Sequence, residues 1–362
     1  AYSFSRNIDS DYFMSWLNPI VAAYSDGFTS WWPLRIGAYT REMWLCAAAA
    51  LWLVSLLCTR RYGKNLAGSF VKGMKRIYMP VLAAVLAAAG IYMYQNQPFI
   101  DHGASEWIDE NNIIASPVTD ASSVRYSILA EPATGKLTGR AEYTLEKPYC
   151  GEDRLLLNPG YKVKSMTYGG KKVEYRTVVD DLNGVRSTYF TLPDVPGETL
   201  VIEYGGLPTV SKVMSVSDLI DDTIDPDYIV LGSASFVPLI NYLCPEGSCT
   251  IDITIPDHLV PFLDYQEMTE SSGHKNGMKT WTSECDIYIM DFKAANYMTQ
   301  SFEAAGTQVD FVYGRSYHEA VEAYDVKQSM KEVLEYCTKH YGKLGFAEVQ
   351  RLILLQVSSM AM

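Results

Sequence analysis

Two long runs without a charged residue constrain this chain more than any other feature of its 362 residues. Residues 43–59 read MWLCAAAALWLVSLLCT, and residues 77–100 read IYMPVLAAVLAAAGIYMYQNQPFI. A helix that spans a bilayer needs about 20 mostly apolar residues. Arg, Trp and Tyr residues bracket both runs, as membrane anchors do. We therefore expect two transmembrane helices within residues 43–100, with a pair of buried core helices as the alternative.

The loop that joins the two runs sets the expected orientation. Residues 60–76 contain six Lys or Arg and no Asp or Glu, an excess typical of cytoplasmic loops. Both flanks are then exterior or periplasmic. The charge divides at the same place, because residues 1–100 hold nine basic and four acidic residues, whereas residues 101–362 hold twenty-one and thirty-eight. The expected partner is the lipid bilayer, and the net charge of −12 argues against nucleic acid.

Two further segments flank the expected helices. Residues 1–42 are rich in Trp, Tyr and Phe and predict an exterior interfacial segment. The chain starts at Ala1 without a signal-peptide pattern, so we expect it to be part of a longer protein. Residues 101–123, which read DHGASEWIDENNIIASPVTDASS, predict a polar tether between the membrane and the next domain.

Residues 124–314 have the pattern of an exterior β-rich domain. Short segments of β-branched and aromatic residues, such as VRYSILAE, GRAEYTLE and TLVIEYGG, often alternate with polar residues. Gly, Pro, Asn and Asp separate them, as in turns. Several strands at this spacing indicate a β-sandwich or a large curved sheet.

The hydrophobic period changes in residues 315–362. Apolar residues recur at helical spacing in residues 317–341, and Gly342 is suited to end that helix. The segment VQRLILLQV at 349–357 predicts a buried strand. The last residues, SSMAM, form no closing element, so we expect this domain to be truncated.

Histidine offers one weak candidate for a metal site. His318 and Glu319 begin the segment HEAVE, but a zinc helix of the H-E-x-x-H type needs a second His where Glu322 stands. An exposed helix start is the other interpretation. His340 falls in the last turn of the expected helix, where the helix dipole favours a basic residue.

Seven cysteines are present. Cys244 and Cys249, in CPEGSC, are the predicted disulfide, because they are close in sequence and are expected to lie outside the cytoplasm. A zinc half-site is the alternative, although no second pair of ligands is near. Cys150, Cys285 and Cys337 are interpreted as isolated thiols.

The acidic segment 218–227 reads DLIDDTIDPD. Carboxylates in this number can hold Ca²⁺, but their spacing does not match an EF-hand loop, so a solvated acidic loop is the interpretation. The sequence contains no phosphate-binding loop, no dinucleotide fingerprint and no G-x-S-x-G nucleophile elbow. The residues themselves therefore identify no catalytic, cofactor-binding or metal site in this chain.

The strand motifs follow the order VRYSILAEP, LTGRAEYTL, DRLLLNPGYKVKSMTYGGKKVEY and STYFTLPDVPGETLVIEYGGLP. This order resembles the N-terminal β-domain of aminopeptidase N-like (gluzincin) zinc metallopeptidases. The later stretch VKQSMKEVLEYCTKHYGKLGFAEVQRLILLQV looks like the start of that family's thermolysin-like catalytic domain. There, a helix that ends in Y-x-G leads to a buried strand.

The upstream residues YTREMWLCAAAALWLVSLLCTRRYG resemble the last helix of a bacterial ABC-type permease of the kind fused to such a peptidase. The resemblance implies a membrane-anchored mixed fold of two transmembrane helices, a mainly antiparallel β-sandwich and a short α/β start of a thermolysin-like domain. It implies a bacterial inner or plasma membrane, with the β-domain on the exterior or periplasmic side. An ABC-type ATPase subunit and a peptide substrate are the implied further partners.

The resemblance implies zinc in the full-length parent and no cofactor in this chain. The family's H-E-x-x-H helix and G-x-M-E-N loop would follow Met362, so this chain is expected to be inactive alone. The family's β-domain also presents a Gln or Glu to the substrate amine, and the matching stretch IVLGSASFVP at 229–238 has neither.

Three functions stay open at this point. The first is support of zinc-dependent peptide hydrolysis in the parent, the second is a non-catalytic peptide- or substrate-binding module on a transporter permease, and the third is an anchored β-sandwich adhesin. The helix and strand expected after residue 315 argue against the third, because a plain sandwich does not need them.

Overall fold

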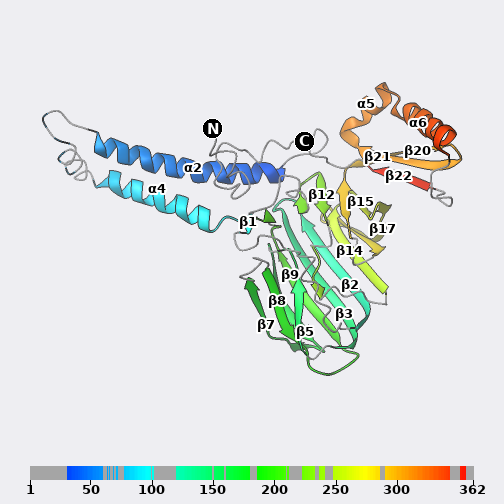
Figure 1. Ribbon diagram of the computed structural model, residues 1–362, viewed down its shortest axis with the longest axis horizontal. Coiled ribbons are helices and arrows are strands. Elements are labelled where there is room, and N and C mark those ends of the chain that lie inside the picture. The colour runs from blue at the N-terminus through cyan, green and yellow to red at the C-terminus, as the bar shows by residue number, and fades with distance from the viewer. Residues whose placement is uncertain are drawn as a thin grey trace.

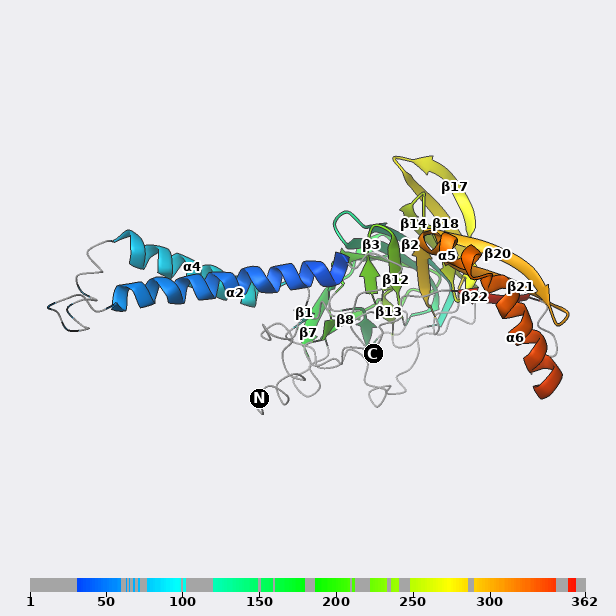
Figure 2. The same ribbon diagram turned by 90° about the horizontal axis from the view of Figure 1, so that it is seen from above.

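The structure is a computed structural model that describes residues 31–59, 63, 65, 68, 71, 77–98, 100–101, 120–148, 151–158, 160–179, 186–208, 210–211, 222–232, 236–240, 248–285, 290–342 and 351–355. Two long helices project from one side of a β-rich body (Figure 1). A small unit of helices and strands lies on the other side of that body, and the view from above agrees (Figure 2).

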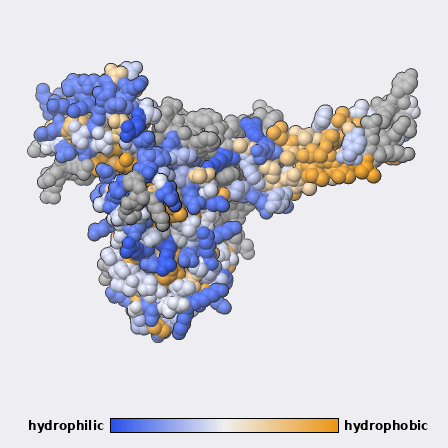
Figure 3. Space-filling view, turned by 180° about the vertical axis from the view of Figure 1, so that it is seen from behind, coloured by the Kyte–Doolittle hydropathy of each residue, from blue (hydrophilic) through white to orange (hydrophobic). Residues whose placement is uncertain are grey.

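The two long helices, α2 (Trp31–Cys58) and α4 (Tyr78–Gln95), form an antiparallel hairpin. Within them, Gly37–Cys58 and Tyr78–Gln95 are long and apolar enough to cross a membrane. The hairpin exposes a continuous apolar surface (Figure 3), which includes Leu45, Leu51, Trp52, Val81, Val85 and Ile91. The two predicted apolar helices are therefore present.

The helices approach closely because their facing residues are small. A Cβ at Gly90 would lie 3.5 Å from the backbone oxygen of Met43, an ordinary van der Waals distance, so a residue no larger than Ala fits between the two backbones. The Tyr39 hydroxyl donates to the Met93 carbonyl (3.1 Å) and joins the helices near the β-rich body. Ala83 is buried in the same seam.

The first helix begins earlier than its charge-free run. Residues 31–42, the last part of the expected interfacial segment at 1–42, are helical and continuous with the apolar run. Arg and Glu are good helix formers, so Arg41 and Glu42 do not interrupt the helix. Residues 1–30 and most of the basic loop at 60–76 lie outside the described residues.

The largest sheet of the β-rich body has eight strands, and β14 pairs with β2 in parallel while its other pairs are antiparallel. Alternate residues face inward, as in β14, where Cys249, Ile251, Ile253 and Ile255 are buried. In spatial order the strands are β17 (Thr269–Lys275), β18 (Met278–Glu284), β14 (Ser248–Pro256), β2 (Asp120–Glu131), β3 (Lys136–Lys147), β9 (Thr199–Gly206), β5 (Tyr161–Tyr168) and β6 (Lys171–Lys172).

Two smaller antiparallel sheets complete the body, which we call the β-domain (β2–β19), and share one hydrophobic core with the large sheet. One sheet contains β13 (Leu239–Ile240), β4 (Glu152–Leu156), β8 (Arg186–Thr191) and β7 (Tyr175–Val179). The other contains β11 (Asp222–Ile224), β12 (Tyr228–Leu231), β19 (Phe292–Ala295), β15 (Val260–Leu263) and β16 (Gln266–Glu267). The predicted mainly antiparallel β-structure is therefore confirmed at the level of the sheets.

Two contacts join the β-domain to the helix hairpin. The short strand β1 (Ile100–Asp101), which follows α4, pairs in parallel with β10 (Val210–Ser211), which follows β9. Arg35 of α2 donates to the Pro132 and Ala133 carbonyls in the β2–β3 turn (3.2 and 3.3 Å). The expected tether at 101–123 is thus not the sole link; its residues 102–119 lie outside the described residues, and residues 120–123 already belong to β2.

The C-terminal unit is a three-stranded mixed sheet with a helical crossover. β20 (Tyr297–Ala304) and β21 (Thr307–Gly314) form a hairpin, and β22 (Arg351–Leu355) pairs with β21 in parallel. Between β21 and β22 lie a short 3₁₀ turn (Arg315–Tyr317), α5 (His318–Ala323) and α6 (Val326–Tyr341). The predicted strand at 349–357 is confirmed over the residues of β22.

The single helix predicted at 317–341 is divided in two. Asp325 adopts a positive φ of 44°, which breaks the helix, and its carboxylate accepts from the Gln328 N–H (3.3 Å) to cap α6. Met330 and Leu334 of α6 pack against the apolar side chains of β20 and β21. Gly342 ends α6 as predicted, with a φ of 88°.

Candidate functional site

The stretch at 229–238, which the motif resemblance aligns with an amine-binding segment, is hydrogen-bonded to strands of the large sheet. Residues 229–231 belong to β12, whose four residues are all buried. Tyr204 of β9 donates its hydroxyl to the Phe236 carbonyl (2.9 Å). Tyr143 of β3 donates to the Pro238 carbonyl. Residues 233–235 lie outside the described residues.

The tyrosines that hold this stretch form a buried row. Tyr126, Tyr143 and Tyr204 are each at most 1% exposed, and the Tyr126 and Tyr143 hydroxyls are 3.1 Å apart. Burial raises the pKa of all three phenols well above the ordinary value of 10. They are therefore neutral hydrogen-bond donors at pH 7. This row was not predicted from the sequence, although Tyr at inward positions of the predicted strands was a signal for it.

A second buried polar group, the Asp222 carboxylate, holds Gly232 within the same stretch. One oxygen of Asp222 accepts from the Gly232 N–H (3.1 Å), and the other accepts from the Asn158 amide (3.2 Å). Burial, and then the nearby Asp222 carboxylate, raises the pKa of Tyr161. Asp222 thus satisfies buried donors within the fold.

The interpretation of residues 218–227 as a solvated acidic loop is wrong for two of its carboxylates. Asp222 is 5% exposed and Asp225 is 1% exposed, because β11 and the following turn pack into the core. The Asp225 N–H also donates to the Tyr228 carbonyl (2.9 Å) in the β11–β12 turn. Residues 218–221 lie outside the described residues.

The segment HEAVE begins helix α5, and its histidine, His318, contacts Tyr313. The Nδ1 of His318 lies 3.0 Å from the Tyr313 hydroxyl, and the two rings are stacked. Glu322, at the position of the missing second ligand, accepts from Gln300 of β20. His340 lies in the last turn of α6 as predicted, with its Nδ1 2.9 Å from the Tyr336 carbonyl.

The disulfide prediction named the wrong partner for Cys249. Cys249 is bonded to Cys285, and the two Cα atoms are 5.2 Å apart. Strand pairing causes this choice: β14 and β18 run antiparallel, and the Cys285 N–H donates to the Cys249 carbonyl (3.0 Å), so the two side chains meet. Cys285 is therefore not an isolated thiol. Cys337 is free as predicted, and Cys244 and Cys150 lie outside the described residues.

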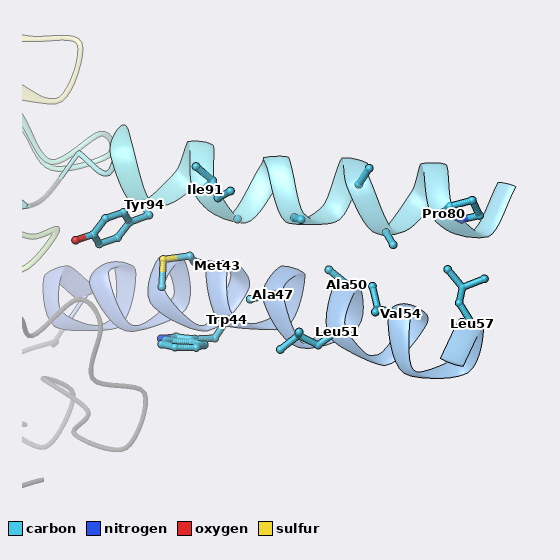
Figure 4. Close-up of a pocket in the computed structure, with 14 residues that line it drawn as sticks. Met43, Trp44, Ala47, Ala50, Leu51, Val54, Leu57, Pro80, Ile91 and Tyr94 are labelled. Carbon is cyan, nitrogen blue, oxygen red and sulfur yellow. The ribbon is translucent and has the colours of Figure 1, made fainter. Parts of the chain in front are cut away.

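The described part of the chain holds no group of three or more His, Cys, Asp or Glu that could bind a metal ion. A cavity of about 670 Å³ lies between α2 and α4 and is lined by apolar side chains, including Met43, Trp44, Leu51 and Ile91 (Figure 4). A smaller cavity, of about 230 Å³, lies between β5 and the four-stranded sheet, where Tyr161, Asn158 and Thr188 supply polar groups.

Comparisons with known proteins give the following. No protein-family model and no curated protein matches the sequence. Among solved structures, an M1 zinc metallopeptidase from Deinococcus radiodurans is similar at 15% identity and a TM-score of 0.43, over 69% of this chain and 60% of that one. A point variant of that enzyme bound to a Tyr-Ser-Ala substrate is similar at 16% identity and a TM-score of 0.42, over 66% and 57%. The chain thus spans less than two thirds of the length of the structures it resembles.

Proposed function

We propose that this chain is the membrane-anchored, exterior β-domain of a larger zinc metallopeptidase-like protein that hydrolyses peptides and is joined to an ABC-type exporter permease. In this proposal α2 and α4 anchor the protein in a bacterial inner or plasma membrane. The β-domain lies on the exterior or periplasmic side and supports the peptide substrate. The C-terminal unit begins the catalytic-type domain of the parent protein.

The observation that carries the proposal is the change of architecture after residue 297. An antiparallel β-domain is followed by a β-hairpin, a crossover helix and a parallel strand, β22. A parallel pair needs a crossover, and α6 supplies one. The motif resemblance predicts the helix and the following strand of this order as the start of the catalytic domain. A plain anchored adhesin does not require it.

The described residues of this chain do not fit a zinc ion. They contain no cluster of three candidate ligands, and the Nδ1 of His318 lies within hydrogen-bond distance of the Tyr313 hydroxyl. Three protein ligands and an open position are the usual set for catalytic zinc. Zinc therefore belongs to the parent in this proposal, and no catalytic step is assigned to residues of this chain.

The test uses the intact parent protein in its native membrane and compares it with the 362-residue chain. We expect about one zinc ion per parent molecule by elemental analysis and hydrolysis of a leucyl anilide that stops when a chelator removes the metal. The 362-residue chain should show no turnover. A parent with neither zinc nor turnover contradicts the proposal.

A second candidate is a non-catalytic binding module, and one observation favours it. The described parts of the matching stretch, residues 229–232 and 236–238, present no Gln or Glu to a substrate amine, and they are buried. Under this candidate the parent binds peptides or another substrate and releases them unchanged. Calorimetric titration of the parent with a peptide, followed by mass analysis of that peptide, separates the two candidates.

A further inference from the structure

Most outer strands of the three sheets in the β-domain are protected against pairing with another chain. β6, β13 and β16 contain two residues each, and β11 is buried. The register of β17 with β18 shifts between Glu270 and Ser272 and again before Lys275, so its edge is irregular and charged. Short, buried, irregular and charged edges are the features by which natural sheets avoid the addition of a further strand.

The outer strand β7 (Tyr175–Val179) lacks this protection. All five of its residues pair with β8 in unbroken register, and no described strand lies on its other side. Figure 1 shows β7 at the outside of the β-domain, and Thr177 and Val178 are exposed. The only charged residue of β7, Arg176, binds Glu152 of β4 (2.8 Å), so its charge is held along the sheet. Alternate backbone groups of β7 therefore face outward and can pair with an added strand.

The cavity of about 230 Å³ reaches the inward face of this unprotected strand. Thr177 of β7 lines the cavity and is itself exposed, so the cavity extends to the outermost strand of the sheet. The Thr177 and Thr188 hydroxyls bond to each other (3.0 Å), and Asn158 binds Asp222 and the Gly160 N–H. The apolar walls are formed by Leu155, Leu157 and Val163. Because these polar groups are engaged within the fold, the cavity suits an aliphatic side chain.

We propose that β7 binds a peptide in extended conformation, which adds a strand to the four-stranded sheet and places one aliphatic side chain in the cavity beside Thr177. In this mode of recognition main-chain hydrogen bonds supply the affinity, and a pocket for a side chain supplies the specificity. The inference deepens the proposed function, because it rests on the peptide substrate that both candidate functions share. It does not rest on zinc.

A second copy of the chain fits the edge of β7 less well than a peptide. The antiparallel pairings of two β7 strands that overlap most, centred on residue 176 or 177, place the two Arg176 residues directly opposite or diagonal to each other. Like charges in these positions are destabilising. A peptide with an uncharged central part avoids this repulsion.

The test uses the full chain in nanodiscs and a blocked probe peptide, acetyl-KTVTLTVTK-amide. We expect binding by calorimetric titration and slower amide exchange in residues 175–179. Two further peptides carry N-methyl groups on alternate residues, one in each of the two phases. A strand uses one edge to pair, so one of these peptides should bind about tenfold more weakly or worse, and the other should bind as the unmodified peptide does.

Two variants of β7 test the contribution of the cavity. Thr177→Phe fills the end of the cavity at β7 and should weaken binding about tenfold or more. Val178→Phe introduces the same side chain on the opposite face of the strand and should leave binding unchanged. If Thr177→Phe does not fold, the unaltered chain is titrated with a peptide whose central leucine is replaced by glutamate. That peptide should also bind about tenfold more weakly or worse, because its carboxylate would enter an apolar cavity.

Three results overturn the inference: equal binding of the two N-methylated peptides, slower exchange outside residues 175–179 alone, or a peptide-free dimer with slow exchange at 175–179. The last would assign the edge to a second copy. No binding on β7 by a chain whose parent hydrolyses the leucyl anilide contradicts this inference alone. Binding on β7 by a chain whose parent has neither zinc nor turnover contradicts the hydrolytic function alone.

Discussion

The helix hairpin exposes many of its apolar side chains, whereas the β-domain buries most of its own. In the hairpin, Leu51 is 68% exposed and Ile91 is 59% exposed, whereas in the β-domain Leu200 and Ile253 are fully buried. Water favours the second arrangement and opposes the first. The proposed membrane anchoring accounts for this difference, because the two regions then face two solvents, one polar and one apolar. It also means that equal substitutions have unequal effects in the two regions.

The largest effect is expected from matched leucine truncations. Leu200→Ala removes a fully buried side chain from β9 and should lower the free energy of unfolding of the β-domain by about 2–5 kcal/mol. Leu51→Ala removes an exposed side chain from α2 and should leave that value unchanged. Urea denaturation in detergent, followed by near-ultraviolet circular dichroism, compares the two. Equal losses would contradict the two-solvent interpretation.

The next largest effect is expected from removal of the Cys249–Cys285 disulfide, because the cysteines of the hairpin, Cys46 and Cys58, are free. Replacing Cys249 and Cys285 with Ser should lower the free energy of unfolding of the β-domain by about 3 kcal/mol, because the disulfide closes a loop with a sequence separation of 36 residues. Cys337→Ser, at a free thiol, is the control. Non-reducing peptide mapping that found Cys249 joined to Cys244 would restore the pairing predicted from sequence.

Alkaline pH should weaken the β-domain through its buried tyrosines. The folded-state pKa of Tyr143 lies above the unfolded value near 10, so stability is complete below pH 10 and is lost as the pH rises toward the folded pKa. Each such tyrosine contributes about 1.4 kcal/mol per pH unit in that window. Tyr143→Phe should reduce this slope between pH 10 and 11, and the exposed Tyr265→Phe should not.

The smallest effect is expected where the two regions meet. Arg35→Ala removes two hydrogen bonds to the β2–β3 turn and should speed amide exchange in residues 131–136, with a loss of about 1 kcal/mol. Arg41→Ala, on the same helix, is the matched control. Gly135→Ala should mimic the first variant, because its φ is 70° and a Cβ would lie 2.4 Å from the Arg35 guanidinium. If amide exchange in residues 131–136 is unchanged in both Arg35→Ala and Gly135→Ala, Arg35 does not stabilise the β2–β3 turn.

Sequence patterns predicted the parts of the fold that local physics determines. The two apolar runs, the alternating strands and the strand at 349–357 are each set by the period of their own residues. The division of the helix at Asp325 was missed, because a single residue in the left-handed region leaves the hydrophobic period unchanged. The early start of α2 was missed because absence of charge was used as the boundary of a helix.

The candidate site was less accessible to sequence reasoning, because its contacts join distant residues. Cys249 lies closer in sequence to Cys244 than to Cys285, but the antiparallel pairing of β14 and β18 decides its partner. In the sequence, nothing distinguishes Asp222 from its acidic neighbours, but in the structure β11 places it beside Gly232 and Asn158. Such pairings depend on strand order, which the alternation of a strand does not encode.

The parallel pairing of β2 with β14 has a consequence for the biogenesis of the protein. β2 is the first long strand of the β-domain to be synthesised, yet its register with β14 joins residues more than 100 positions apart, such as Val124 and Cys249. One edge of β2 must therefore wait, unpaired, until most of the β-domain has been made. Until then that edge is open to incorrect strand pairing, and closure of the Cys249–Cys285 bond, which joins β14 to the residue after β18, would mark the end of its vulnerability.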